Sequence, residues 1–296
     1  MCWRCFPQNA TDDTQALDRA LAAAHARLSR RQLLKAGVGF VAVSGSTLSA
    51  CATVPVTGRS QLRLVSERQE AQLGVQAYQQ LRADEVKKGR LLTEREDPVA
   101  HAWVKRVSDR VIAASGLAQK YQWQYMIINA PKTVNAAAIA GGRIIVYSGL
   151  LPVAANDAGL ATVLGHETGH VVAHHTAERM SQDELASLAQ VAAGVAGGGQ
   201  LGMAAVGLGA QVGFLLPYSR SQESEADHIG ILLMAKAGYD PRESVHLWER
   251  MNQAGGGRPP EFLSTHPNPE TRITQLEGWM AQANQYYQNP NLPLPE

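Results

Sequence analysis

The stretch VLGHETGHVVAHH, residues 163–175, constrains the fold of this chain more than any other. It places four histidines and one glutamate among the apolar residues of what reads as a half-buried helix. His166 and His170 are four residues apart. On a helix their side chains lie on one face, about 5–6 Å apart, and two imidazoles at that spacing can bind one Zn²⁺. The stretch therefore predicts a helix that carries two metal ligands.

Glu167 follows the first of these histidines directly. From that position its carboxylate can reach a water molecule bound to the metal, so HETGH is an instance of the HExxH pattern of zinc proteases. We therefore predict His166 and His170 as zinc ligands and Glu167 as the general base. The alternative is an ordinary helix with two solvated histidines.

The two later histidines of the stretch are poor candidates for the third ligand. One zinc ion between His166 and His170 cannot also reach His174, which lies one further turn along. The metzincin pattern would place a histidine six residues after His170, and that position holds Thr176. We interpret His174 and His175 as polar helix residues that can form hydrogen bonds near the site.

A second stretch, YSRSQESEADHIG at residues 218–230, offers the missing ligand. Glu223 and Asp227 are again four residues apart. One carboxylate can bind the metal while the other, one turn away, orients an imidazole through its free N–H group. The alternative for this stretch is a solvated acidic helix face. Together with HETGH, the stretch indicates a catalytic site of two histidines and one carboxylate.

The N-terminal region reads as an export signal. Residues 29–51 place Arg30, Arg31 and Lys35 before a charge-free, mildly apolar run that ends in LSAC. The arginine pair resembles a twin-arginine signal, and LSAC resembles the site at which bacterial lipoproteins are cleaved and lipidated on Cys51. Ala52 then favours the outer membrane. The alternative is an amphipathic or buried N-terminal helix, and residues 1–28 are given no function.

Composition limits which residue types could bind a metal and which partners are expected. The chain has 296 residues, 45% hydrophobic and 18% charged, which is typical of a globular protein, and its net charge of +1 gives no indication of a nucleic-acid partner. Its three cysteines are Cys2, Cys5 and Cys51, and the first two precede the predicted cleavage site. Any metal in the mature chain must therefore be held by histidine, aspartate or glutamate.

Periodicity predicts an α+β fold. Helices are expected from Glu67 to about residue 88 and from Pro98, with Asp97 as N-cap. A strand is expected from residue 122, and a hairpin bent at Gly141 and Gly142 follows. Asn156 or Asp157 is expected to cap the HETGH helix. An extended substrate could then pair with the strand at residues 142–147.

The charge-free residues 185–219 separate the two metal-binding stretches. By length they could span a bilayer, but they are rich in glycine and have no basic or aromatic flanks. A single span would also separate His166 from Glu223. We expect a mobile, partly helical flap over the zinc cleft.

Three ordered motifs, HETGHVVAHHTAER, SRSQESEADHIG and LSTHPNPETRI, make the chain resemble a known family. It is similar to the HExxH metallopeptidases related to CAAX prenyl proteases, especially their periplasmic lipoprotein branch of BepA and LoiP type. The resemblance implies a mostly helical, zincin-like (gluzincin) domain with a small β-sheet or hairpin beside the active-site helix. The expected division is a leader at 1–50, a lipid-anchored tether and helix at 51–95, the peptidase domain at 96–287 and a proline-rich tail at 288–296.

The resemblance also assigns roles to residues. It implies one Zn²⁺ per chain held by His166, His170 and Glu223, with Glu167 as the base. Asp227 would orient a ligand, and Arg272 would support the site. His266 would either stabilise the oxyanion or occupy the metal's open position in a resting state, and it is expected on a loop before a helix capped by Asn268 and Pro269.

The implied function is zinc-dependent cleavage of misfolded or misassembled envelope proteins, on the periplasmic face of the outer membrane and with its assembly machinery as a possible partner. The alternative is a lipid-anchored chaperone or assembly factor that binds client proteins with little proteolysis. One departure concerns the predicted hairpin, where Asn135 is followed by AAAIAGG and relatives commonly read NAFALPGG. This difference affects the expected shape of the substrate groove.

Overall fold

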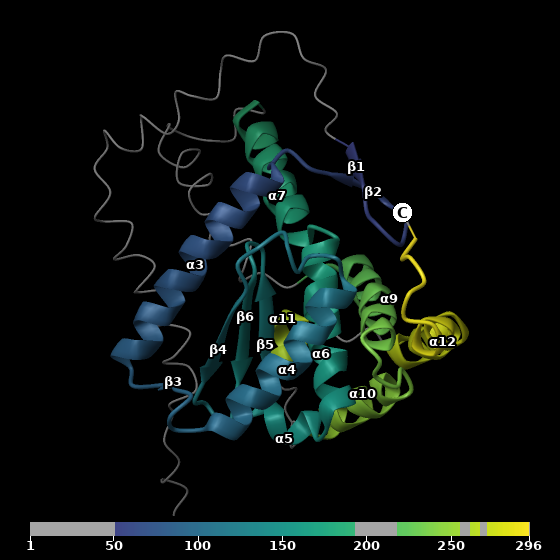
Figure 1. Cartoon of the computed structure of the whole chain (residues 1–296). Coiled ribbons are helices and arrows are strands. Elements are labelled where there is room, and N and C mark those ends of the chain that lie inside the picture. Colours follow the sequence, from purple (N-terminus) through teal and green to yellow (C-terminus); the bar gives the residue numbers. More distant parts are fainter. Residues whose placement is uncertain (1–50, 193–217, 255–260, 267–270, 296) are drawn as a thin grey trace, which may run out of the picture. The chain divides into compact units, whose positions relative to one another are not determined.

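A computed structural model of the chain describes residues 51–192, 218–254, 261–266 and 271–295. These residues form an α+β fold, as predicted, in which helices surround a small sheet (Figure 1). The described strands are β1 (Cys51–Thr53), β2 (Ser60–Leu62), β3 (Leu91–Leu92), β4 (Gln124–Ile128), β5 (Ala136–Ile139) and β6 (Arg143–Tyr147). The described helices are α3 (Glu67–Lys87), α4 (Pro98–Ala114), α5 (Leu150–Ala154), α6 (Asp157–Val172), α7 (His175–Ala192), α9 (Arg220–Lys236), α10 (Glu243–Ala254), α11 (Glu261–Thr265) and α12 (Arg272–Gln288).

The main sheet has the strand order β3-β4-β6-β5. The predicted hairpin is confirmed: β5 and β6 pair antiparallel, and Gly141 and Gly142 turn the chain with φ values of 87° and 82°. β6 also pairs in parallel with β4. Because β6 has a neighbour on both sides, the expectation that a substrate pairs with residues 142–147 is wrong. β5 lies at the edge of the sheet, next to α6.

The helix that carries HETGH is shorter than predicted. Asn156 caps α6 as expected, since its side chain accepts a hydrogen bond from the Gly159 amide at 2.8 Å. The helix ends at Val172, however, and His174 adopts a left-handed conformation with φ of 52° before α7 begins at His175. A hydrogen bond of 2.6 Å between His174 Nδ1 and Glu70 Oε2 of α3 holds His174 at this break between the two helices. His174 therefore faces α3 instead of continuing the face of the metal-binding helix.

Helices α6 and α9 touch through their backbones at glycines. A methyl group on Gly165 would lie 2.7 Å from the Gly230 carbonyl oxygen, and one on Gly169 would lie 2.8 Å from that of Ala226. In the opposite direction, a methyl on Gly230 would come within 2.7 Å of the His166 amide nitrogen. Only glycine allows this approach, because real side chains do not tolerate such distances. The contact brings the acidic stretch of α9 directly beside the HETGH helix.

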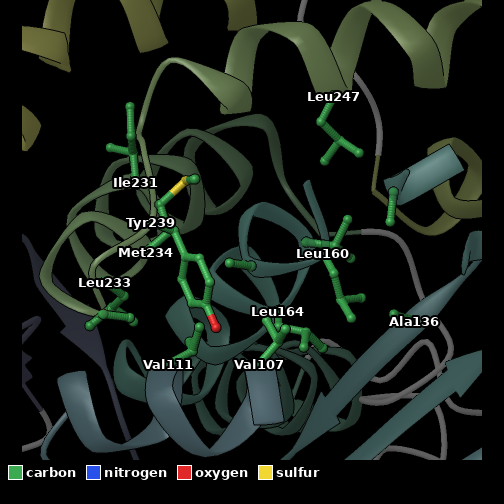
Figure 2. Close-up of a cluster of buried hydrophobic side chains, with 14 of the residues drawn as sticks. Val107, Val111, Ala136, Leu160, Leu164, Ile231, Leu233, Met234, Tyr239 and Leu247 are labelled. Carbon is green, nitrogen blue, oxygen red and sulfur yellow. The ribbon is translucent and has the colours of Figure 1, made fainter. Parts of the chain in front are cut away.

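Apolar side chains from several helices surround this contact. Figure 2 shows Val107 of α4, Leu164 of α6 and Leu233 of α9 in one cluster, together with Leu247 of α10. All four are completely buried. Burying a side chain of this size contributes about 1.5–3 kcal/mol each. The core therefore fixes α6 and α9 against α4 and α10.

The segment expected to be a tether is structured from its first described residue. β1 and β2 form a hairpin that begins at Cys51, and its turn holds the buried Val54. The Val56 amide donates to the Pro295 carbonyl at 3.1 Å, which joins this segment to the C-terminal end of the chain. The hairpin thus belongs to the folded body.

Two other predictions fall largely on residues that the structure does not describe. The predicted flap at 185–219 lies mostly outside the described residues, apart from its start in the last turns of α7 and its final two residues. The predicted cap at Asn268 and Pro269 also lies outside them. Among the described helices, none has both the length and the apolar character that a membrane span requires.

The helix contact yields a stability prediction. Gly169→Ala should lower the free energy of unfolding by about 1–3 kcal/mol, because the added methyl forces α6 and α9 apart. Gly278→Ala is the matched control: it lies within α12, no atom lies within 4 Å of its added methyl, and it should be neutral or stabilising. Urea unfolding of the purified chain measures both. Equal stability of the two variants would contradict the contact.

Candidate metal centre

Three side chains converge at the contact between α6 and α9. The Nε2 atoms of His166 and His170 are 3.1 Å apart, and each lies 3.5 Å from a carboxylate oxygen of Glu223. All three side chains are buried. Two come from successive turns of α6, as the i, i+4 spacing predicts, and the third comes from the first turn of α9. The two imidazole nitrogens and the Glu223 carboxylate thus form a triangle of donor groups, in which His166 faces Oε2 and His170 faces Oε1.

Glu223 is held as an anion. It lies in the first turn of α9, which begins with a capping box between Ser219 and Gln222. Arg272 of α12 donates to its Oε2 at 2.7 Å. Burial alone would raise the pKa of Glu223, but the charge of His166 and hydrogen bonds from neighbouring imidazoles outweigh it and hold that pKa far below its usual range. The carboxylate is therefore available as a ligand.

His166 is oriented by Asp227, the second carboxylate of the acidic stretch. Asp227 Oδ1 lies 2.8 Å from His166 Nδ1, and its Oδ2 accepts from Arg272 Nε at 2.5 Å. The Arg272 guanidinium lies over the ring of Trp248 at 4.0 Å. Burial favours a neutral His166 ring, yet Asp227 raises the pKa of His166 above its usual value. A metal cation at Nε2 would take the place of that extra proton.

His170 has a different kind of partner. Its Nδ1 lies 2.7 Å from Nδ1 of His175, whose Nε2 lies 2.9 Å from Glu225 Oε2. The ring of Tyr218 stacks on His170 at a centroid distance of 3.8 Å. Burial lowers the pKa of both imidazoles, His170 and His175. A neutral His170 leaves its Nε2 lone pair free for a metal.

Glu167 lies beside these donor groups, and one of its two oxygens accepts no hydrogen bond from the described residues. Its Oε2 accepts from the Ala138 amide of β5 at 3.2 Å. Its Oε1 is buried and has no hydrogen-bond partner among the described residues, with His266 Nε2 at 3.4 Å. Burial raises the pKa of Glu167. A carboxylate in this environment can take up a proton more readily than an exposed one.

His266 completes the group from the other side. It follows the short helix α11, where a plain loop was expected, and its amide donates to the Phe262 carbonyl at 2.8 Å. Its Nδ1 lies 3.1 Å from Glu223 Oε1 and 3.3 Å from His166 Nε2. The Phe262 ring stacks on it at 4.4 Å. His266 therefore offers a fourth donor to the same point.

These donors fit a tetrahedral zinc ion. Four ligand atoms, one from each of a set of side chains, lie within 4.8 Å of one another; the set is His166, His170, Glu223 and His266. Donors at about 2.0–2.1 Å from a tetrahedral Zn²⁺ are roughly 3.3 Å from one another. In the structure His166 Nε2 lies 3.1 Å from His170 Nε2 and 3.3 Å from His266 Nδ1, which in turn lies 3.1 Å from Glu223 Oε1. Imidazole and carboxylate donors also suit Zn²⁺. The site can hold a metal ion of this kind.

The structure brings together all the residues predicted for the site. His175 forms a hydrogen bond beside the site, as the sequence analysis allowed, whereas sequence reasoning missed the ring contacts of Tyr218 with His170 and of Trp248 with His166 and Arg272. The sequence did not predict the break at His174, after which His175 begins α7 and its Nδ1 lies 2.7 Å from His170 Nδ1. His174 points away toward α3.

Comparisons with known proteins agree with this geometry. The model of peptidase family M48 matches residues 98–280, more than half of the chain. The mitochondrial metalloendopeptidase OMA1 of Schizosaccharomyces pombe is 36% identical over 78% of this chain and 66% of its own length. The beta-barrel assembly-enhancing protease of Escherichia coli K12 is 31% identical over 75% of this chain and 46% of its own.

The alignments thus span less than two thirds of either relative. The family match nevertheless covers α4 to α12, and with them every donor of the candidate metal centre. The resemblance predicted from three motifs is confirmed. On these grounds the chain belongs to peptidase family M48.

Proposed function

We propose that this chain is a zinc-dependent endopeptidase that cleaves misfolded or misassembled proteins of the bacterial cell envelope. One observation carries the proposal: beside the metal donors, Glu167 presents a buried oxygen that accepts no hydrogen bond from the described residues. A closed structural zinc site has no use for such a carboxylate, whereas peptide hydrolysis requires a base at that place. The family membership supports the same activity.

In this proposal His166, His170 and Glu223 hold the zinc ion. When bound there, zinc would supply Lewis acidity, which makes a water molecule more acidic and polarises a peptide carbonyl. Asp227 and Arg272 keep the His166 ring and the Glu223 carboxylate in place. These contacts hold the donors in position before a substrate arrives.

Glu167 performs the proton transfers. Its Oε1 takes the proton of the attacking water and afterwards delivers it to the leaving amine. The Ala138 amide holds Oε2, so the carboxylate cannot rotate freely. Burial keeps water away and raises the pKa of Glu167 toward the range in which a base both takes and returns a proton.

His266 occupies the fourth corner of the donor set. With this ring in place the site has the closed form of a four-ligand centre, so His266 must withdraw before a substrate carbonyl can enter. Of the two roles considered from the sequence, its distance of 3.1 Å from Glu223 Oε1 favours that of a resting-state ligand.

Substrates are proposed to bind along β5. This strand is at the edge of the sheet, and the Ala138 amide points from it toward Glu167. An extended chain can add to such an edge through backbone hydrogen bonds, with little dependence on its sequence. The three alanines of β5 leave room for varied side chains. Unfolded proteins of many sequences suit this mode of binding.

The envelope location rests on the sequence of the first 52 residues and on the relatives. Arg30, Arg31 and Cys51 have the pattern of an exported lipoprotein. The relative in Escherichia coli is named for enhancing β-barrel assembly, whereas the fission-yeast relative is named as mitochondrial. The lipoprotein pattern favours the bacterial envelope for this chain, and the outer-membrane assembly machinery is then its candidate partner.

Metal content is the first test. The purified chain should carry one zinc ion, and His166→Ala or Glu223→Ala should lose it because each removes a donor of the triangle. Glu167→Gln should keep it. Elemental analysis measures all four proteins. Full zinc in the Glu223→Ala protein would remove this residue from the ligand set.

Activity is the second test and separates an enzyme from a chaperone. The chain should degrade an unfolded model protein, and a chelator should stop it. Glu167→Gln should slow cleavage at least about 10²-fold, the lower range for loss of a general base. Glu249→Gln, on the exposed face of α10, is the control and should cleave normally. Binding without cleavage by the wild-type chain would favour the chaperone.

Location is the third test. Cys51→Ser should release a soluble periplasmic form, because the proposed acyl chains attach to that thiol. Replacing Arg30 and Arg31 together by lysine should leave precursor in the cytoplasm. Fractionation of cells that express each variant reads out both effects. A Cys51→Ser protein that stays firmly on the membrane would count against lipid anchoring.

A further inference from the structure

The two zinc-ligand histidines are supported in unequal ways. His166 has a carboxylate, Asp227, on its Nδ1. His170 has another imidazole, that of His175, at 2.7 Å. His175 is completely buried, so no water replaces this contact. The orientation of His170 therefore depends on how His175 itself is held.

Only one arrangement of protons satisfies the hydrogen bonds that link His170, His175 and Glu225. If His170 binds a metal through Nε2, its Nδ1 carries the proton and donates to Nδ1 of His175. A neutral imidazole has one donor and one acceptor nitrogen, so His175 must then carry its proton on Nε2. That proton points to Glu225 Oε2 at 2.9 Å. The Glu225 carboxylate thus selects the tautomer of both rings.

Glu225 is in turn held by the hairpin formed by β1 and β2. Arg59 Nε donates to Glu225 Oε2 at 2.8 Å, and the Thr57 hydroxyl donates to Oε1. Arg59 also makes two hydrogen bonds of 2.7 Å to Glu178 of α7. Glu225 and Glu178 are both buried. One arginine, from the turn at residues 54–59, therefore fixes both acids behind the metal centre.

We infer that His175 is a positioning residue for the zinc ligand His170, and that Arg59 of the N-terminal hairpin holds it in place through Glu225. The metal centre then extends more than 100 residues upstream of HETGH, into a segment outside the family match at 98–280. The inference rests on the proposed function only in that the site binds zinc. Partners of this kind typically contribute about 10–100-fold to metal affinity.

The test measures zinc affinity of the full chain by competition with a chelator, and the unfolding of each metal-free variant alongside it. His175→Phe keeps a ring but removes both hydrogen bonds, and it should weaken zinc binding about 10–100-fold. His175→Asn should recover part of the loss, because its side-chain oxygen can still accept from His170. A role in packing alone would not be rescued by this smaller residue.

A second pair of variants tests the contribution of the N-terminal hairpin to zinc binding. Arg59→Ala should weaken zinc binding about 10-fold, at the lower end of such effects. Arg63→Ala, four residues along and paired with Glu67 at 3.6 Å, should leave it unchanged. The double variant Arg59→Ala, His175→Phe should bind no more weakly than His175→Phe alone, because Arg59 acts through His175.

Unchanged zinc affinity in folded His175→Phe would overturn the inference, as would equal affinities in Arg59→Ala and Arg63→Ala. If His175→Phe does not fold, the comparison of Arg59→Ala with Arg63→Ala decides alone. A wild-type chain that binds no zinc would instead sink the proposed function. Normal zinc binding in the wild type with unaffected variants would sink only the inference.

Discussion

The backbone contact between α6 and α9 is the constraint on which the site depends. Gly165 and Gly169 on one helix meet Gly230 and Ala226 on the other at distances that exclude a further methyl group. Side chains that flank such a contact are forced together, because no bulky residue separates the helix axes. The short separation of Glu223 from His166 follows from this packing. The apolar core shown in Figure 2 maintains the approach.

Close packing also concentrates charge where water is excluded. Acidic side chains on α7 and α9 are buried around His166 and His175. Arg272 pairs with two of these acids and Arg59 with the other two. Buried ion pairs are a weak source of stability, since desolvation offsets much of their attraction, but removing one partner is costly. In this site the ion pairs fix the positions of side chains. Each arginine holds two carboxylates in fixed positions, and each set of carboxylates fixes one imidazole.

Short sequence patterns predicted most of the helices and strands. They did not predict the contacts between residues far apart in the sequence. Asn156, Asp97 and the glycine pair at 141–142 were recognisable because caps and turns depend on a few neighbouring residues. The donor set came from helical spacing and from the resemblance. The helix end at Val172 was missed because His174, a non-glycine residue in the left-handed region, is held there by Glu70, about a hundred residues away. The role of Arg59 has the same long-range origin.

The pairing of Cys51 within the N-terminal hairpin has a consequence for where a protein anchored at this residue could work. Arg59 is bound to the buried acids only eight positions later, and an extended chain covers at most about 3.3–3.6 Å per residue. If the proposed acyl chains are attached to Cys51, they hold the bilayer close to the folded body, because Cys51 itself pairs with Leu62 and at most about 30 Å of extended chain separates it from Arg59. A protein tethered so closely could sample only polypeptides displayed at the membrane surface. The distance from the membrane, more than the sequence of the client protein, would then decide which proteins it binds.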